Sequence, residues 1–224
     1  MISLLVPTRE RPVGLARLED SARATALDPA GVEIVAYVDD DDHGYDDWTG
    51  TVTFVRGPRR NLSECWNLCQ AEATGPIYGH MGDDIVFRTS GWDRWVENVF
   101  ARYEDRIVFV HGEDGIQGQR IGTHGFLHQR WIDAVGYFVP PYFSSDYNDL
   151  WLTEVADAID RRVYIPQVLT EHLHYSVGKS EIDQNTLDRL QRHAEDDVSS
   201  LYQSLDGERA VDAAKLREVM IDGS

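Results

Sequence analysis

The chain has 224 residues and a formal net charge of -18, from 39 acidic and 21 basic side chains. This length suits one large α/β domain with a tail and is too short for two well-cored domains plus linkers. The acidic composition argues against a surface that grips bulk nucleic acid, because such binding depends on lysine and arginine displacing counterions from phosphates. An anionic ligand can still bind locally, through a metal ion or a few placed arginines.

The two cysteines, Cys65 and Cys69, lie four residues apart on an expected helix. This spacing is poorly suited to a disulfide, and two cysteines alone make a weak metal site, so we interpret both as buried helix positions. The chain shows no secretory signal and no apolar run near the ~20 residues needed to span a bilayer. We therefore expect a soluble protein in the reducing cytoplasm.

The first half of the chain alternates apolar, strand-like runs with amphipathic helices. The expected strands are residues 2–8, 32–38, 51–57, 77–81 and 106–112, and the expected helices are residues 12–27, 61–75 and 91–103. This rhythm predicts an α/β fold with a mostly parallel sheet flanked by helices on both faces. Ligands bind beyond the carboxyl ends of the strands in such sheets, and two acidic clusters fall there.

The second half of the chain is less regular. Residues 113–126 are rich in glycine and are expected to form a loop or a hairpin, followed by a short helix over residues 128–136. A further helix is expected over residues 146–160, and a last strand over residues 163–175.

Residues 181–222 are polar, acidic and helix-forming. We therefore divide the chain into an α/β domain over residues 1–180 and a helical C-terminal extension over residues 181–224. The extension is expected to pack on the domain, or in a partner, as in a homodimer formed through these helices.

The stretch GHMGDDIVF, residues 79–87, places Asp83 and Asp84 side by side before a strand-like run. Two carboxylates ~4 Å apart repel each other by several kcal/mol at an effective dielectric constant near ~20. A divalent cation between them removes that cost, whereas a solvated turn can hold them apart. Both readings are open from this motif alone.

A second acidic set, YVDDDD at residues 37–42, ends a neighbouring strand. An aspartate at this edge can accept a hydrogen bond from the N3–H group of a uracil or from a ribose hydroxyl. Several arginines follow the first and third strands, namely Arg9, Arg11, Arg56, Arg59 and Arg60. Such a concentration suits a diphosphate, although surface scatter explains any one of them.

Four segments, in this order, resemble the nucleotide-binding half of a GT-A glycosyltransferase, closest to the family 2 type. They are ISLLVPTRERP, VAYVDDDD, RRNLSECWNLCQAEATGPIYGHMGDDIVF and FLHQRWIDAVGYF. The resemblance covers roughly residues 2–180 and implies a GT-A, Rossmann-like catalytic domain over residues 1–180. It also implies transfer of a hexose from a nucleotide-sugar donor, taken here as a UDP-sugar.

The resemblance implies a set of donor-binding positions in this chain. They are Pro7, Thr8, Arg9, Arg11, Asp39, Asp40, Arg60, Asn67, Asp83 and Lys179. Asp39 would face the base, and Lys179 would pair with the diphosphate if its segment closes over the donor.

The implied metal ligands for Mn²⁺ or Mg²⁺ are Asp84, His172 and His174. Asp84 matches the second aspartate of the metal motif, while Gly82 stands where the first usually is and leaves Asp83 as a substitute. The two histidines of EHLHY share one side of the last expected strand and match a C-terminal metal-binding histidine of the family. Either histidine can instead be structural.

The family carries an acidic pair before a D-L-x-L helix, where one acid serves as the catalytic base. The matching segment here is SSDYNDLWL, with Tyr147 at the usual aspartate position. We expect Asp146 to be the base and Asp149 to be the second candidate. Either could simply cap the helix.

The sequence thus predicts a metal-dependent, inverting glycosyltransferase that transfers a sugar to a hydroxyl of an unidentified acceptor, with a retaining reaction left open. One alternative is a nucleotidyltransferase, but that class would usually show a glycine-rich basic loop after the first strand, which PTRERPVG matches poorly. The other alternative is a non-catalytic nucleotide-sugar-binding protein, which the departures at Gly82 and Tyr147 keep open.

Overall fold

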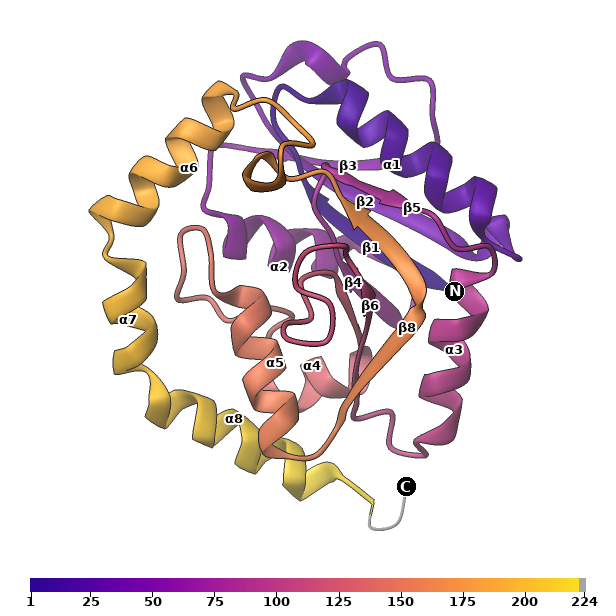
Figure 1. Cartoon of the computed structure of the whole chain (residues 1–224), viewed down its shortest axis with the longest axis vertical. Helices are drawn as coiled ribbons and strands as arrows, with labels where there is room; N and C mark the ends of the chain where they lie inside the picture. Colours follow the sequence, from indigo (N-terminus) through magenta and orange to yellow (C-terminus); the bar gives the residue numbers. More distant parts are fainter. Residues whose placement is uncertain (222–224) are drawn as a thin grey trace.

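The computed structural model describes residues 1–221, which form one mixed sheet of eight strands flanked by helices (Figure 1). The strands are β1 (Ile2–Pro7), β2 (Val32–Asp39), β3 (Thr53–Gly57), β4 (Ile77–His80), β5 (Ile85–Phe87), β6 (Phe109–Glu113), β7 (Gly125–His128) and β8 (Arg162–His172). The helices are α1 (Pro12–Thr25), α2 (Leu62–Glu72), α3 (Trp92–Arg102), α4 (Gln129–Val135), α5 (Asn148–Ala158), α6 (Gln184–Glu195), α7 (Val198–Ser204) and α8 (Asp206–Val219). The predicted α/β fold is confirmed.

The strands lie in the order β3-β2-β1-β4-β7-β6-β8-β5. Strands β3, β2, β1 and β4 are parallel to one another, and β8 is parallel to β6. Strand β7 is antiparallel to β4 and β6, and β5 is antiparallel to β8. The region expected to be a loop or a hairpin therefore ends in a strand, which enters the sheet between β4 and β6 and makes this half of the sheet mixed.

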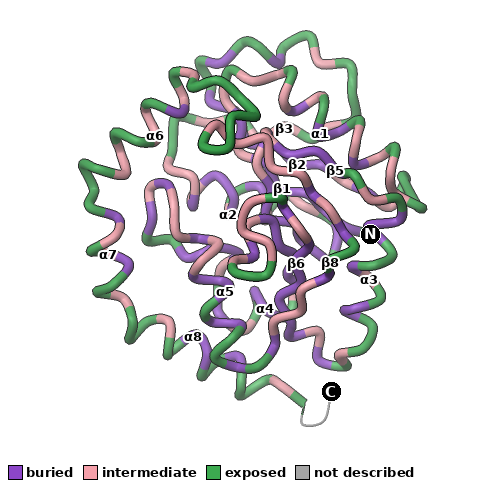
Figure 2. Tube along the Cα trace, viewed as in Figure 1, coloured by how far each residue is buried: buried purple, intermediate pink, exposed green. Residues whose placement is uncertain are grey.

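The apolar side chains of the strands alternate between two faces of the sheet, as the period of a strand requires. In β1, Leu4 and Val6 contact the core on the side of α1 and α3, whereas Leu5 contacts the core on the side of α2, α4 and α5. Burial on both faces explains why this parallel strand is an almost continuous apolar run. Figure 2 shows these central strands as the buried part of the molecule.

Helix α2 begins with a capping box, in which Asn61 and Glu64 satisfy each other's backbone N–H groups. Its buried face carries Cys65 and Cys69, which are free thiols. The interpretation of both cysteines as buried helix positions is confirmed.

Helices α6, α7 and α8 form an arc along one side of the molecule, from orange to yellow in Figure 1. Helix α8 packs on α4 and α5 and buries Ala213 and Leu216 in the apolar core. Thr186 is the one residue of Gln184–Glu195 that is buried, and Leu187 keeps 49% of its surface exposed. The sequence correctly indicated helices here, and the division at residue 180 stays a prediction.

None of the helices within residues 1–221 is long and apolar enough to cross a membrane. The exposed segment between β8 and α6 contains a short 3-10 helix, η3 (Tyr175–Val177), so the last expected strand ends at His172 (Figure 2).

Candidate functional site

The centre of the candidate site lies where the end of β8 meets the segment after β4. Strand pairing puts His172 opposite Ile85, and the N–H group of Leu173 donates to the carbonyl of Asp84 over 2.8 Å. The side chains of Asp84 and His172 therefore come together, with 3.2 Å between Oδ2 and Nε2. The structure thus places two of the expected metal ligands side by side.

The third expected ligand, His174, lies next to this pair. Its ring centroid is 4.9 Å from that of His172. Its Nδ1 contacts the hydroxyl and the backbone N–H of Ser176, at 2.7 and 3.3 Å. Nε2 is therefore the nitrogen of His174 that can face a ligand.

His124, which sequence reasoning missed, completes the cluster from the chain before β7. Its ring centroid is 4.8 Å from that of His172, and both of its nitrogens are buried with no hydrogen-bond partner among residues 1–221. Burial and the nearby charge of His172 lower its pKa, so the ring is neutral. A glycine-rich loop gave no sequence signal for this contact, which only the β7 pairing creates.

The electrostatics around Asp84 favour an ionised carboxylate. Burial acts to raise the pKa of Asp84, but the hydrogen bond from His172 and the charges of the neighbouring histidines and Arg11 outweigh it and lower this pKa. A carboxylate with imidazoles is a donor set that suits Mn²⁺.

These residues fit a metal ion only in part. Within residues 1–221, no group of three or more histidine, cysteine or acidic side chains is arranged to hold a metal by itself. Asp84 and His172 fit as two protein ligands, and the unpartnered nitrogens of His124 show unused bonding capacity beside them. Mg²⁺ bound by one or two carboxylates commonly takes its remaining ligands from substrate phosphates and water.

Asp83 faces away from Asp84 and has its own partners. Its carboxylate accepts hydrogen bonds from the Thr8 hydroxyl at 2.7 Å and from the Arg11 guanidinium at 3.1 Å. Burial raises its pKa, and the charge of Arg11 opposes this shift. The adjacent aspartates are therefore separated by different protein partners, and Asp83 stabilises the turn after β1.

Gly82 occupies its position for a steric reason. A Cβ atom at this residue would lie 2.7 Å from Oδ1 of Asp84 and 3.9 Å from Cε1 of His124. Any side chain here would push against the carboxylate that approaches His172. The glycine in place of the usual aspartate therefore leaves room for the Asp84–His172 contact.

The expected base-binding edge forms at the ends of β1 and β2. The Arg9 guanidinium bridges Asp39 at 2.6 Å and Asp41 at 2.7 Å. Asp39 is buried, whereas Asp40 is exposed and its backbone N–H donates to the carbonyl of Gly57. Pro7 ends β1 directly before this edge. These residues are close together, but Arg9 already has two carboxylate partners.

Arg11 also has carboxylate partners, and one of them lies on the C-terminal arm. The arm is defined here as α6 with its N-cap residue, together with α7. The Arg11 guanidinium binds both oxygens of Asp183, at 2.6 Å each, and donates to Thr186 at 3.0 Å. Asp183 is the N-cap of α6. Arg11 therefore joins the Asp83 turn to the beginning of the arm.

Three other expected donor-binding residues are engaged with the protein itself. Arg60 pairs with Glu64, and Lys179 pairs with Glu171. Asn67 donates to the carbonyls of Ser63 and Val139, and its Oδ1 accepts from the N–H groups of residues 138 and 139. The assignment of Asn67 to the donor site stays a prediction, and in this structure its amide is fully used in bracing a loop.

The two base candidates differ sharply in their surroundings. Both carboxylate oxygens of Asp146 are engaged by the arm, through Arg189 at 2.5 Å and His193 at 2.7 Å. Asp149 lies in the first turn of α5, where one oxygen accepts from the N–H group of Leu150. Burial raises the pKa of Asp149 to about 6, against the opposing charge of His172.

Tyr147, which takes the family's usual aspartate position, faces the arm as well. Its backbone is left-handed, with φ of 73°. Its ring stacks on Tyr202 with 4.7 Å between centroids, and its hydroxyl lies 2.9 Å from that of Ser199. Tyr147 therefore fastens α7 to the start of α5.

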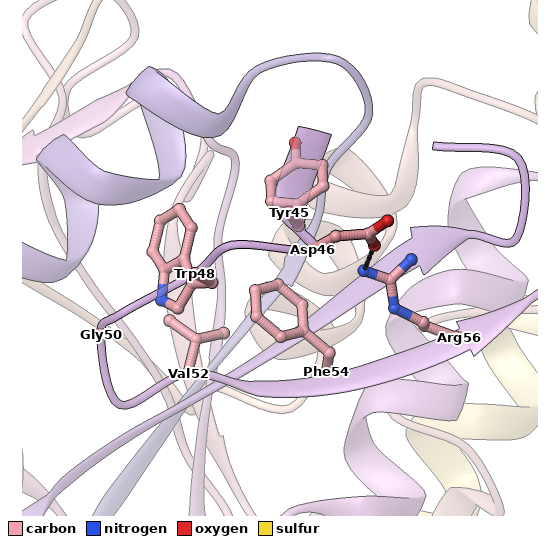
Figure 3. A pocket seen from close by; sticks show the side chains of 7 residues that line it. All are labelled: Tyr45, Asp46, Trp48, Gly50, Val52, Phe54 and Arg56. Carbon is pink, nitrogen blue, oxygen red and sulfur yellow. Dashed lines mark hydrogen bonds and ion pairs between the residues drawn. The ribbon is translucent and has the colours of Figure 1, made fainter. Parts of the chain in front are cut away.

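A separate pocket of about 440 Å³ lies at the outer edge of the sheet, beside β3 (Figure 3). The rings of Tyr45, Trp48 and Phe54 pack against one another at 5.7 to 6.1 Å, and Arg56 pairs with Asp46 at the other wall. Of the arginines noted for a diphosphate, Arg56 lines this pocket, but none of the expected donor-binding, metal-ligating or catalytic residues does.

No protein-family model and no curated protein sequence matches the chain. Solved structures, however, match its fold. A mannosyltransferase, PcManGT from Pyrobaculum calidifontis in complex with GDP-Man and Mn²⁺, aligns with a TM-score of 0.61 and 13% identity, over 97% of this chain and 73% of that one. TarS from S. aureus, residues 1–349, aligns with a TM-score of 0.56 and 12% identity, over 86% of this chain and 71% of that one.

GalNAc-T7 with UDP, GalNAc and Mn²⁺ aligns with a TM-score of 0.63 and 12% identity, over 78% of this chain and 44% of that chain. The resemblance to GT-A glycosyltransferases is thus confirmed at the level of the fold. At these identities the likeness concerns the arrangement of the chain, and the chemistry has to be argued from the residues themselves.

Proposed function

We propose that this protein is a metal-dependent glycosyltransferase, which transfers a hexose from a UDP-sugar to an acceptor hydroxyl. The single observation that carries the proposal is the approach of Asp84 to His172, beside the unpartnered nitrogens of His124. This cluster lies next to the edge of the sheet where β1 and β4 end. That edge is where ligands usually bind in α/β sheets. Structural neighbours that hold Mn²⁺ with GDP-Man or with UDP support the same class of ligand.

The proposed donor site divides the work between two regions. Asp84 and His172, with His174 as a third ligand, would hold Mn²⁺ or Mg²⁺. The bound cation would neutralise the negative charge of the leaving diphosphate. Asp39 would accept a hydrogen bond from the base, with Pro7, Thr8 and Asp40 around it. Arg9, Arg11, Arg60 and Lys179 would reach the diphosphate only by exchanging a carboxylate partner for a phosphate, because each is paired in the described chain.

We assign the catalytic base to Asp149 in preference to Asp146. An acceptor hydroxyl must give up its proton to a carboxylate with a free oxygen and a pKa close to the working pH. Asp149 meets both requirements, with one oxygen bound to Leu150 N–H and a pKa of about 6. Both oxygens of Asp146 are bound to Arg189 and His193. Direct attack by the deprotonated hydroxyl on the anomeric carbon gives an inverting reaction.

A non-catalytic nucleotide-sugar binder is the second candidate, because Tyr147 replaces the usual acid and packs on the arm. The release of free UDP from UDP-hexoses, with and without Mn²⁺, separates the two functions. Thermal melts with a panel of GDP-hexoses test whether the nucleobase of the donor is uracil or guanine. A bound donor raises the melting temperature by mass action. Mn²⁺-dependent stabilisation without UDP release would favour the binder, and incorporation of a nucleotide into product would favour a nucleotidyltransferase.

A further inference from the structure

The inner side of α6 carries basic side chains that the proposed donor site does not use. Asp188, Arg189, Arg192 and His193 are spaced so that they share one face of the helix. Arg59, from the loop before α2, reaches this face and pairs with Asp188 at 2.7 Å. Arg59, Arg189, Arg192 and His193 are called the α6 cluster below. It stands out in a chain with a net charge of -18.

Arg192 is the unusual member of the α6 cluster. Arg59 and Arg189 each have a carboxylate partner, Asp188 and Asp146 respectively. Arg192 is partly buried, its Nε has no hydrogen-bond partner, and no ion pair joins it to any carboxylate within residues 1–221. Every other lysine or arginine without a partner in that range is exposed, so among the described residues Arg192 alone combines partial burial of the side chain with a buried, unpartnered Nε.

The surroundings of Arg192 also disfavour its charged form. Burial lowers its pKa, and the positive charges of Arg59 and Arg189 lower it further. Asp188 and Asp196 act in the opposite direction, but neither forms a hydrogen bond with it. A guanidinium presents a planar fork of donors that matches the oxygens of a phosphate, so a bound phosphate would satisfy Nε and offset the repulsion.

The α6 cluster is joined to the segment that carries the proposed catalytic base. Arg189 joins it directly to Asp146, which comes three residues before Asp149, and its other nitrogen lies 3.3 Å from the Tyr175 hydroxyl. Two of the expected metal ligands, His172 and His174, come shortly before Tyr175 in the chain. We propose that the α6 cluster binds a phosphate group of the acceptor, separately from the diphosphate of the donor. This assignment to the acceptor rests on the proposed glycosyltransferase function.

The test is calorimetric titration of the full chain with inorganic phosphate, in Mg²⁺, before and after saturation with UDP. Phosphate should bind with the same affinity in both states. Arg192→Gln should weaken phosphate binding roughly tenfold or more, the scale expected for losing a hydrogen bond to a charged group. The matched control is Arg102→Gln, an exposed arginine at the end of α3, which should leave phosphate affinity unchanged. Thermal melts confirm that both variants are folded.

Each outcome decides the proposal. Displacement of phosphate by UDP would assign the cations to the donor's diphosphate and overturn a separate acceptor subsite. Absence of phosphate binding, or equal binding by wild type and Arg192→Gln, would overturn the anion site itself. If phosphate binds through Arg192 while UDP and Mg²⁺ do not bind at all, the anion site stands and its assignment to an acceptor fails together with the proposed function.

Discussion

Beside Asp84, the ring of His124 is buried with both nitrogens unpartnered, whereas at the arm both oxygens of Asp146 are bound by Arg189 and His193. Both regions are built from charged and polar side chains at the same edge of the sheet. These two side chains differ in whether the chain satisfies their bonding groups. Buried polar atoms in folded proteins nearly always have partners, so each unpartnered group calls for an explanation such as a bound water, ion or ligand.

The C-terminal helices are held to the rest of the chain by two different kinds of interaction. Helix α8 is held by apolar burial, with Ala213 and Leu216 in the core. Helix α6 is held by ion pairs and hydrogen bonds, chiefly from Arg11, Arg59 and Asp146. A ligand can exchange with ion pairs at an exposed edge far more easily than with a packed core. We therefore expect the arm to be displaced more easily than α8.

The largest effect on donor binding is expected from Asp84, beside His172 and His124. Asp84→Ala should abolish Mn²⁺-dependent binding of UDP, because it removes the carboxylate that approaches His172. Calorimetry of UDP with Mn²⁺ measures this loss. The control is Asp47→Ala, an exposed aspartate in the loop before β3, which should bind UDP as wild type does. Equal UDP affinity in the Asp84 variant would remove this residue from the metal site.

The next effect distinguishes the two carboxylates at the start of α5. Asp149→Asn should lower sugar transfer by the ~10² to 10⁴ typical of losing a general base, with donor affinity unchanged. Asp146→Asn should lower transfer less, because that carboxylate is already bound to the arm. Rates and donor affinities of both variants, with melts as folding controls, test this order. A folded, fully active Asp149→Asn would return the role to Asp146 or to neither residue.

The role of Asp149 can also be tested through the pH dependence of sugar transfer. A base must be ionised to accept a proton, and the raised pKa of Asp149, about 6, means that it becomes protonated as pH falls through that value. Transfer by the wild type should therefore decline below a pH of about 6. The residual activity of Asp149→Asn should lack this acidic limb. An unchanged limb in the variant would show that another group titrates there.

A moderate effect is expected at the base-binding edge. Asp39→Ala should weaken UDP binding by about 1 to 3 kcal/mol, the cost of leaving a buried hydrogen-bonding group unpaired. The same substitution removes a partner of Arg9. The UDP affinity of Arg9→Gln is therefore measured as well, to show what loss of the ion pair alone does. Calorimetry that finds wild-type affinity in Asp39→Ala would mean that the nucleotide is oriented differently.

The smallest effect concerns the arm. Exposed ion pairs contribute about 0 to 1 kcal/mol each and are weakened by salt. High salt should therefore increase hydrogen exchange in the amides of α6 while leaving α8 protected. Mass spectrometry of peptides from both helices measures the difference. Equal responses of the two helices would contradict the view that they are held by different forces.

The sequence predicted much of the fold because the strands of the first half are continuous apolar runs separated by amphipathic helices. It did not predict the position of β7, since GFLH is too short to identify a strand and only long-range pairing places it between β4 and β6. The approach of Asp84 to His172 was expected from a resemblance to a family. The burial of His124 beside them depends on β7 and could not be read from local sequence.

The sequence was least informative where side chains serve the chain itself. Asn67 matched an expected donor-binding position, yet its amide braces residues 138 and 139. Asp146 matched an expected base, yet it is bound by two residues of α6. Both cases involve contacts over 40 residues or more along the chain, which local patterns do not report.

The metal site is tested most directly by locating Mn²⁺ in crystals grown with UDP, by its anomalous scattering. One Mn²⁺ peak is expected between Asp84 and the phosphates of UDP, within bonding distance of His172 or His174. The same crystals of Asp84→Ala should lack that peak. Mn²⁺ bound at the acidic residues 39–42 instead, or UDP bound with no metal near Asp84, would contradict the account.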